Sequence, residues 1–411
     1  MRIPLSKPDI GEREIELVTR VLRSGQLSLG PVVAEFEEKF AAYVGTRYAV
    51  ATSSGTAALH LAVEALGIGA GDEVLTTSFS FVASANCLLY AGAVPSFVDI
   101  DPVTLNLDHK LLQEAISRDY VWDRARSHLV NRQSGRLLKA ILPVHVFGLP
   151  CEMEPILELA EVFNLKVIED ACEALGAMYG GRRAGTFGDA AAFAFYPNKQ
   201  MTTGEGGMLV TDDPSIAKTC RSLRNQGRDE DSSWLRHIRL GYNYRLSELH
   251  CALGLAQLER IDELLFARAR AAAAYSRGLG DVPQVSLPCE MADAARSWFV
   301  YVIGLQGSAG PVLRDHLMEG LREHGIAGQA YFPAIHRQPY FEEIGLASQR
   351  ALPFAESASE RCLALPFFPS MTSEEVSEVC LAVHEILADA HQPAALEQAQ
   401  WTAAGRSATA R

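Results

Sequence analysis

Short apolar runs alternate along the first half of the chain with segments in which apolar residues recur every three or four positions. The first pattern is typical of buried strands and the second of amphipathic helices. Strand-like runs lie at 47–52, 72–77, 94–100, 138–144 and 165–171, and helical patterns lie at 54–66, 81–91 and 151–163. This alternation predicts an α/β fold in which helices cover a largely parallel sheet.

The pattern changes in the second half of the chain. Residues 246–274 contain no proline and keep a helical period, which predicts one long helix leaving the sheet. A strand-like run at 297–305, a helical pattern ending at Gly325 and an amphipathic pattern at 373–387 follow. These segments predict a second, smaller α+β region.

The patterns divide the chain into four parts. We expect an N-terminal segment at 1–30, a large domain at 31–267, a small C-terminal domain at 268–390 and a disordered Ala- and Gln-rich tail at 391–411. The arginine-rich stretch at 117–139 lies between two sheet elements, and its charges predict an exposed excursion.

The composition excludes several classes of protein. Hydrophobic residues make up 48% of the 411 residues and charged residues 21%, as in ordinary globular proteins. The net charge of −13 argues against nonspecific binding to nucleic acid or to an anionic membrane. No apolar stretch approaches the roughly 18 residues that span a bilayer, and the N-terminus lacks the apolar core of a signal peptide. We therefore expect a cytoplasmic protein, and the cysteine spacing predicts no metal site.

Lys199 follows an apolar run and precedes a glycine cluster. Pro197 is expected to end the strand, which places the lysine at the carboxyl edge of the sheet, where open α/β folds bind ligands. A lysine that forms a Schiff base must lose its proton near neutral pH, and Phe193, Phe195 and Tyr196 offer an apolar wall that favours this. A solvent-facing lysine in a Gly-rich turn explains the same segment equally well.

Two further junctions carry candidate chemistry. Ser54, Gly55 and Thr56 begin a predicted helix, where free N–H groups and hydroxyls suit a phosphate. Asp170 ends a strand just before a helix-like run, with Glu173 three residues later, and a carboxylate there suits a protonated heteroaromatic ring nitrogen. Ordinary helix capping explains both junctions as well.

Two aromatic segments are also candidates. Phe81, near the head of a predicted helix, is placed to stack on a planar cofactor, although a Phe there is more often part of the core. Asn243 and Arg245 are polar residues among aromatics in GYNYR, which a buried structural turn also explains.

Taken together, an imine-forming lysine, a carboxylate, an aromatic face and a phosphate cradle describe a site for pyridoxal 5′-phosphate (PLP). On these residues the chain resembles the PLP-dependent nucleotide-sugar aminotransferases of the DegT/StrS type, within the aspartate aminotransferase fold, which has a mostly parallel seven-stranded sheet. The matching segments occur in the family's order and include SSGTAALHLA, FSFVASANCLLYAGAVPSFVDIDP, PVHVFGLPCEMEPI, VIEDACEALGA, GTFGDAAAFAFYPNKQMTTGEGGMLVTDD, GYNYRLSELHCALGLAQLERI and QAYFPAIHRQPYF.

The resemblance implies a role for each cofactor residue. Lys199 holds PLP as a Schiff base and later moves the proton of the 1,3-shift. Asp170 binds the pyridinium nitrogen and Phe81 stacks on the ring. Gly55 and Thr56 bind the phosphate.

The resemblance also implies residues that meet a partner or the substrate. Asn243 reaches the phosphate of the neighbouring subunit's cofactor, so that a homodimer is the minimal active unit. Tyr331 and His336, in the YFPAIH motif, line the sugar pocket. Arg245 and Arg337 are candidate donors to the diphosphate of the nucleotide.

Two positions depart from the family's pattern. Ala194 stands where many relatives have a serine that contacts the phosphate. Glu173 stands where many have a glutamine, near the 3-hydroxyl of the cofactor. The form EDACEALG resembles the perosamine synthase branch, which aminates a 4-keto-6-deoxy sugar nucleotide.

The resemblance thus implies transamination, with L-glutamate as amino donor and a nucleotide-linked keto sugar as acceptor, giving an amino sugar for polysaccharide, glycan or natural-product biosynthesis. Two alternatives remain at this point. One is a sugar 3-dehydratase on the same fold, but those relatives usually carry histidine in place of the lysine. The other is a regulatory or scaffold protein, which would tolerate loss of Lys199 or Asp170, and both are present.

Overall fold

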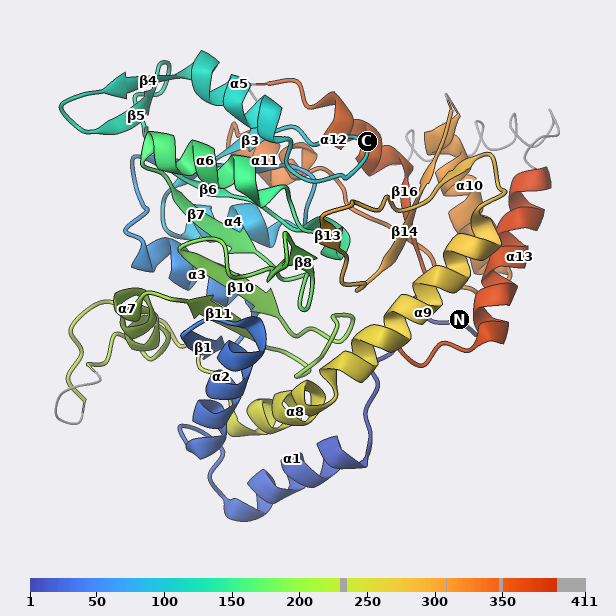
Figure 1. Ribbon diagram of the computed structural model, residues 1–411, viewed down its shortest axis with the longest axis horizontal. Helices are drawn as coiled ribbons and strands as arrows, with labels where there is room; N and C mark the ends of the chain where they lie inside the picture. Colours follow the sequence, from blue (N-terminus) through green and yellow to red (C-terminus); the bar gives the residue numbers. More distant parts are fainter. Residues whose placement is uncertain (230–234, 308, 347–349, 390–411) are drawn as a thin grey trace.

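A computed structural model describes residues 1–229, 235–307, 309–346 and 350–389. Within these residues a nine-stranded sheet forms the centre of the larger part (Figure 1). Its main path has seven strands, in the order β1 (Tyr48–Thr52), β11 (Gly207–Thr211), β10 (Ala190–Ala194), β7 (Lys166–Asp170), β6 (Leu137–Leu142), β2 (Asp72–Thr77) and β3 (Val94–Val98).

The pairing agrees with the predicted, mostly parallel sheet. The pairs β10·β7, β7·β6, β6·β2 and β2·β3 are parallel, whereas β11 runs antiparallel to both β10 and β1. The antiparallel strand follows from a short connection, because β10 and β11 are joined by the loop that carries Lys199 rather than by a crossover helix.

Helices cover both faces of this sheet, because successive side chains of each strand point to opposite faces. Val50, Ala192 and Leu209 pack in one core with one group of helices, and Ala51, Phe193 and Val210 pack in another with helices of the other face. The first face carries α3 (Gly55–Ala65), α4 (Ala83–Tyr90) and α7 (Pro214–Arg224). The opposite face carries α2 (Pro31–Val44), α5 (His109–Asp119), α6 (Met153–Phe163) and α8 (Glu248–Glu259). Helix α1 (Glu12–Ser24) packs on α8.

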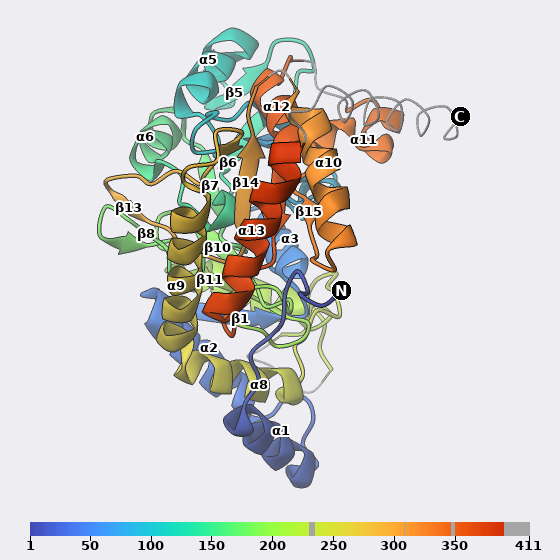
Figure 2. The same cartoon turned by 90° about the vertical axis from the view of Figure 1, so that its right-hand side faces the viewer.

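A smaller antiparallel sheet contains β12 (Val285–Ser286), β14 (Tyr301–Leu305), β16 (Cys362–Leu365) and β15 (Gln329–Ala330). One face of it packs on α9 (Ile261–Leu279), α10 (Gly310–Glu323) and α13 (Ser373–Asp389), of which α9 and α13 lie side by side (Figure 2). Val302 and Ala364 on the other face belong to the same core as the large sheet. The remaining elements are β8 (Met178–Tyr179), β9 (Arg182–Arg183), β13 (Ala294–Ala295), η1 (Val146–Gly148), η2 (Ile335–Arg337), α11 (Pro339–Glu343) and α12 (Pro353–Arg361).

Two predictions need correction. The single helix expected at 246–274 is two helices, α8 and α9, which meet at Arg260. Arg260 has non-helical backbone angles (φ −120°, ψ 20°), and its guanidinium forms ion pairs with Asp9 and Glu14. The turn therefore depends on contacts with the N-terminal segment, which a hydrophobic period along one segment does not reveal.

The stretch at 117–139 is more ordered than the expected excursion. It forms a hairpin of β4 (Tyr120–Asp123) and β5 (His128–Asn131), and β5 pairs with β6. Tyr120 and Asn131 donate hydrogen bonds to the buried carboxylate of Glu73 at 2.7 and 2.9 Å. Residues 117–118, 121–122, 124–127 and 132–135 are exposed, as the charges predicted, but the stretch is anchored to the sheet.

The domain limits expected from sequence remain a prediction. The tail at 391–411 lies outside the described residues. Among those described, no helix is both long enough and apolar enough to cross a membrane.

Candidate active site

Lys199 lies in the loop between β10 and β11, at the carboxyl end of β10. Its main-chain N–H donates to the carbonyl of Tyr196, while Phe195 pairs with Gly206 and Thr203 and closes the base of the loop. The lysine side chain is 14% exposed, with Nζ 3.4 Å from Glu173 Oε1 and 4.1 Å from the centre of the Phe299 ring. This enclosure excludes the solvent-facing alternative.

Glu173 is the acidic partner of the lysine. It is buried, and its Oε2 accepts a hydrogen bond from the N–H of Phe147 at 2.9 Å. Gln200 donates to the main-chain carbonyl of Glu173 at 2.6 Å and so ties this turn to the lysine loop. Burial raises the pKa of the Glu173 carboxyl, although Lys199 and the Phe147 N–H act in the opposite direction. A proton therefore binds more readily at this carboxylate than at an ordinary glutamate.

Asp170 is the last residue of β7 and is 5% exposed. Its Oδ2 accepts a hydrogen bond from Ser84 Oγ at 2.6 Å, and its Oδ1 accepts one from the N–H of Cys172 at 3.2 Å. The helix-like run expected after Asp170 is absent, since residues 171–177 form turns. Helix capping therefore explains neither carboxylate. These donors leave Asp170 in one orientation, ready to accept a further hydrogen bond.

Ser84 is a site residue that the sequence reasoning missed. It lies on α4, three residues after Phe81, and its hydroxyl receives a hydrogen bond from Ser80 at 3.1 Å. Phe81 lies just before α4 with its side chain 60% exposed, which excludes a place in the core. The position of Ser84 one helical turn beyond Phe81 was the available signal.

The predicted phosphate cradle lies at the start of α3. Ser54 is the N-cap of this helix and accepts a hydrogen bond from the N–H of Ala57. Gly55 and Thr56 follow in the first turn, where a helix leaves its N–H groups without partners inside the helix. A Cβ at Gly55 would lie 2.7 Å from that of Ala194 and 2.8 Å from Cys172 Sγ. The start of α3, the end of β10 and the turn after Asp170 therefore meet.

The remaining predicted residues lie in different surroundings. Tyr331 is half-buried, and burial, aided by the nearby charge of Glu173, raises the pKa of its phenol. Asn243 is exposed on a loop, and its main chain forms a β-bridge with Asn225. The side chain of Asn225 accepts a hydrogen bond from Arg245 at 2.9 Å. Within one chain, Tyr331 therefore joins the Lys199–Glu173 cluster, whereas Asn243 lies on the surface.

His336 is only 2% exposed, and both ring nitrogens have partners. Nδ1 lies 2.5 Å from Ser78 Oγ and Nε2 lies 2.9 Å from Glu356 Oε1. Arg337 is exposed and pairs with the same glutamate. Both ring nitrogens of His336 are thus engaged within the chain, and the place of His336 and Arg337 in a sugar or nucleotide pocket remains a prediction.

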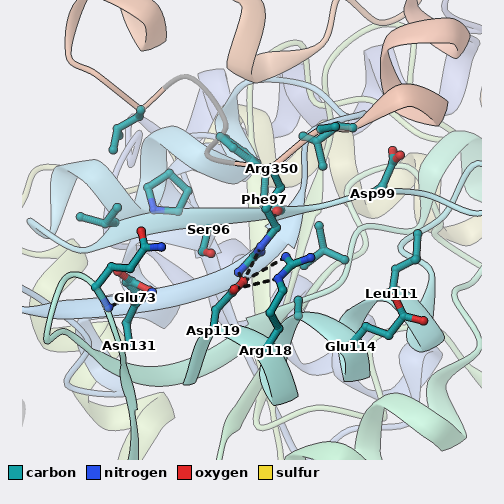
Figure 3. A pocket seen from close by; sticks show the side chains of 18 of the residues that line it. Glu73, Ser96, Phe97, Asp99, Leu111, Glu114, Arg118, Asp119, Asn131 and Arg350 are labelled. Atoms are coloured by element: carbon teal, nitrogen blue, oxygen red, sulfur yellow. Dashed lines mark hydrogen bonds and ion pairs between the residues drawn. The ribbon is translucent and has the colours of Figure 1, made fainter. Parts of the chain in front are cut away.

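A cavity of about 790 Å³ lies between β3, α5 and the segment before α12 (Figure 3). None of the predicted site residues lines it. Arg118 and Arg350, which line it, both donate to Asp119. We attribute these polar groups to packing at the edge of the sheet.

Comparison with known proteins shows the family of the chain. Residues 8–384 match the model of the DegT/DnrJ/EryC1/StrS aminotransferase family. The chain belongs to this family. It is 37% identical to the spore coat polysaccharide biosynthesis protein SpsC of Bacillus subtilis and to the GDP-perosamine synthase of Caulobacter vibrioides, with 94% of this chain and 97% and 98% of theirs covered.

Solved structures show the same fold. The S. venezuelae protein DesV, in complex with a ketimine intermediate, is 34% identical with a TM-score of 0.82, over 93% of this chain and 98% of its own. The 3-amino-5-hydroxybenzoic acid synthase is 29% identical with a TM-score of 0.84, over 94% and 99%. The fold is thus the α/β fold of these aminotransferases, and the chain is a sugar aminotransferase of this family.

The family implies PLP as cofactor, and the residues present fit this group. Lys199 offers an enclosed amine, Asp170 a buried carboxylate fixed by two donors, and the first turn of α3 offers N–H groups for a phosphate. The close approach of Gly55 to Ala194 leaves no room for a side chain at Gly55.

Proposed function

We propose that the enzyme transfers an amino group from L-glutamate to a keto sugar carried on a nucleoside diphosphate, and that the acceptor is a 4-keto-6-deoxy sugar. The enclosed pair of Lys199 and Glu173, in a chain of this family, is the observation that carries the proposal. The relatives named for polysaccharide biosynthesis and for GDP-perosamine synthesis support an amino-sugar product. We also propose that the enzyme acts in the cytoplasm and that it is a homodimer.

We assign each residue a task in this reaction. When bound, PLP supplies the electron sink that makes the substrate carbon acidic. Lys199 would anchor the cofactor and, as a free amine, would then carry the proton of the 1,3-shift. Asp170, oriented by Ser84, accepts the hydrogen bond of the protonated ring nitrogen. Gly55 and Thr56 bind the phosphate, and the exposed ring of Phe81 covers the cofactor.

Glu173 gives the site a group that can take up a proton close to Lys199 Nζ. The resemblance places this residue near the 3-hydroxyl of the cofactor, where a glutamine amide would not titrate. A carboxyl whose pKa is raised by burial can hold the same oxygen and also exchange a proton with the lysine. We therefore expect the residue to take part in proton transfer as well as in binding.

Incubation of the purified enzyme with L-glutamate and a panel of nucleotide-linked keto sugars tests the proposal. We expect 2-oxoglutarate to form in step with one amino sugar, identified by product mass and by the position of its amine. A Lys199→Ala variant should lose at least about 10³-fold in rate, because both attachment and proton transfer depend on this amine. Loss of water from the sugar without amination would instead favour the dehydratase alternative.

A further inference from the structure

Arg268, on α9, is a buried cation directly beneath the lysine loop. It is 2% exposed, and its guanidinium donates to three main-chain carbonyls. Nη2 lies 2.7 Å from the carbonyl oxygen of Lys199 and 3.4 Å from that of Asn198, and Nη1 lies 3.0 Å from that of Phe299. Within the described part of the chain, no carboxylate forms an ion pair with it.

The electrostatics of this arrangement do not favour stability. Burial alone lowers the pKa of the Arg268 guanidinium to about 9, so the group remains charged at neutral pH. A buried charge without an opposite charge carries a desolvation cost. Its Nε has no hydrogen-bond partner, which adds to this cost. The hydrogen bonds of Nη1 and Nη2 to the three carbonyls indicate a different role.

Those contacts join two groups that help to fix the place of the lysine amine. One is the main chain of Lys199 itself. The other is Phe299, whose ring lies 4.1 Å from Nζ. A single planar guanidinium with a fixed fork of donors therefore sets the distance between the backbone of Lys199 and the ring beneath its amine.

We propose that Arg268 is a positioning residue that fixes where the amine of Lys199 can reach. The proposal rests on the proposed function. A displacement of about 1 Å of a reacting group can cost on the order of 10²-fold in rate, so a fixed backbone at this lysine affects turnover more than binding. α9 carries Arg268 from the small sheet to the lysine loop and thereby links the two parts of the molecule.

Arg268→Met tests the proposal, because methionine fills similar space without the donors. We expect the variant to fold, to bind PLP at Lys199 and to keep its KM for the sugar nucleotide. The kcat of the glutamate half-reaction should fall by about 10-fold to 10²-fold. The visible circular dichroism of the bound cofactor should change, and in cofactor-free protein Lys199 should react faster with acetic anhydride, as measured by peptide mass.

Arg361→Met is the matched control. This arginine also donates to main-chain carbonyls, those of Leu305 and Gly307, but it has no contact with the lysine loop. It should match the unmodified enzyme in kcat and dichroism. Arg268→Lys, which keeps one cationic donor, should recover part of the lost kcat. It also serves as the test variant if Arg268→Met does not fold.

A folded Arg268→Met variant with unchanged kcat, dichroism and Lys199 reactivity would overturn the proposal, and so would the same losses in Arg361→Met. If Arg268→Met does not fold, a folded Arg268→Lys variant that matches the unmodified enzyme in all three measurements overturns it. Failure of the proposed function gives a different result. In that case the unmodified enzyme itself holds no borohydride-reducible PLP on Lys199 or releases no 2-oxoglutarate from glutamate.

Discussion

At the scale of single residues, the fold changes the charge behaviour of Glu173. The carboxyl is buried between the main chain of Phe147 and the amine of Lys199. Its raised pKa means that the folded state binds a proton more tightly than the unfolded chain does. This residue therefore favours folding at acid pH, and the contribution is lost as pH rises through the raised pKa.

Glu173→Gln should remove this pH dependence, because the amide does not titrate. In cofactor-free protein, we expect the melting temperature of the variant relative to the unmodified enzyme to increase between about pH 5 and pH 8. Thermal unfolding of both proteins at several pH values in this range measures this difference in melting temperature. A constant difference for Glu173→Gln would show that its pKa is not raised.

At the scale of elements, α2 begins at Pro31, and its N-cap residue is Gly30, which has no side chain to cap the helix. Glu248, at the start of α8 and 1% exposed, supplies the missing acceptors. Its carboxylate oxygens accept from the N–H groups of Gly30, Val32 and Val33 at 3.0, 2.8 and 3.4 Å. Glu248 of α8 thus caps the N-terminus of α2, and this contact joins two helices that are distant in sequence.

Glu248→Ala should lower the free energy of unfolding by about 2–3 kcal/mol, because three partly buried N–H groups lose a charged acceptor. Denaturant titration of the cofactor-free enzyme measures this loss. Glu248→Gln keeps an acceptor oxygen, so its free energy of unfolding should lie between that of Glu248→Ala and that of the unmodified protein. Glu263→Ala, on the exposed face of α9, should stay within about 0.5 kcal/mol of the unmodified protein. If Glu248→Ala lowers the free energy of unfolding no more than Glu263→Ala does, the capping role of Glu248 is contradicted.

The sequence predicted features that depend on local pattern. The strands at 47–52 and 165–171 and the helix at 373–387 were correct, because their periods are set by which face each residue buries. Features that depend on distant residues were missed. The break at Arg260, the hydrogen bond of Ser84 and the contacts of Arg268 each involve residues far apart in sequence. Family motifs supplied the list of candidate site residues, but no spacing gave their orientation.

At the scale of the whole molecule, Asn243 is exposed and its main chain forms a β-bridge with Asn225. A residue that acts on the cofactor of a second subunit is expected in such a place. The active site is then complete only in the dimer, which is part of the proposed function.

Co-expression of Lys199→Ala with Asn243→Asp tests this arrangement, because each variant alone spoils both sites of its dimer. A mixed dimer contains one site with both native residues. With random pairing, the preparation should therefore regain about a quarter of the unmodified activity. Co-expression of Lys199→Ala with the Lys199→Ala/Asn243→Asp double variant is the control and should stay inactive. Absence of recovery would show that the sites are not shared in this way.

The central claim is that Lys199 holds PLP and acts in transamination. The most direct measurement is borohydride reduction of the purified enzyme, followed by peptide mass mapping before and after addition of L-glutamate. We predict a phosphopyridoxyl group on the Lys199 peptide before glutamate is added, and its loss afterwards as 2-oxoglutarate is released. A cofactor attached to another lysine, or a Lys199→Ala variant that still transaminates at the unmodified rate, would contradict the account.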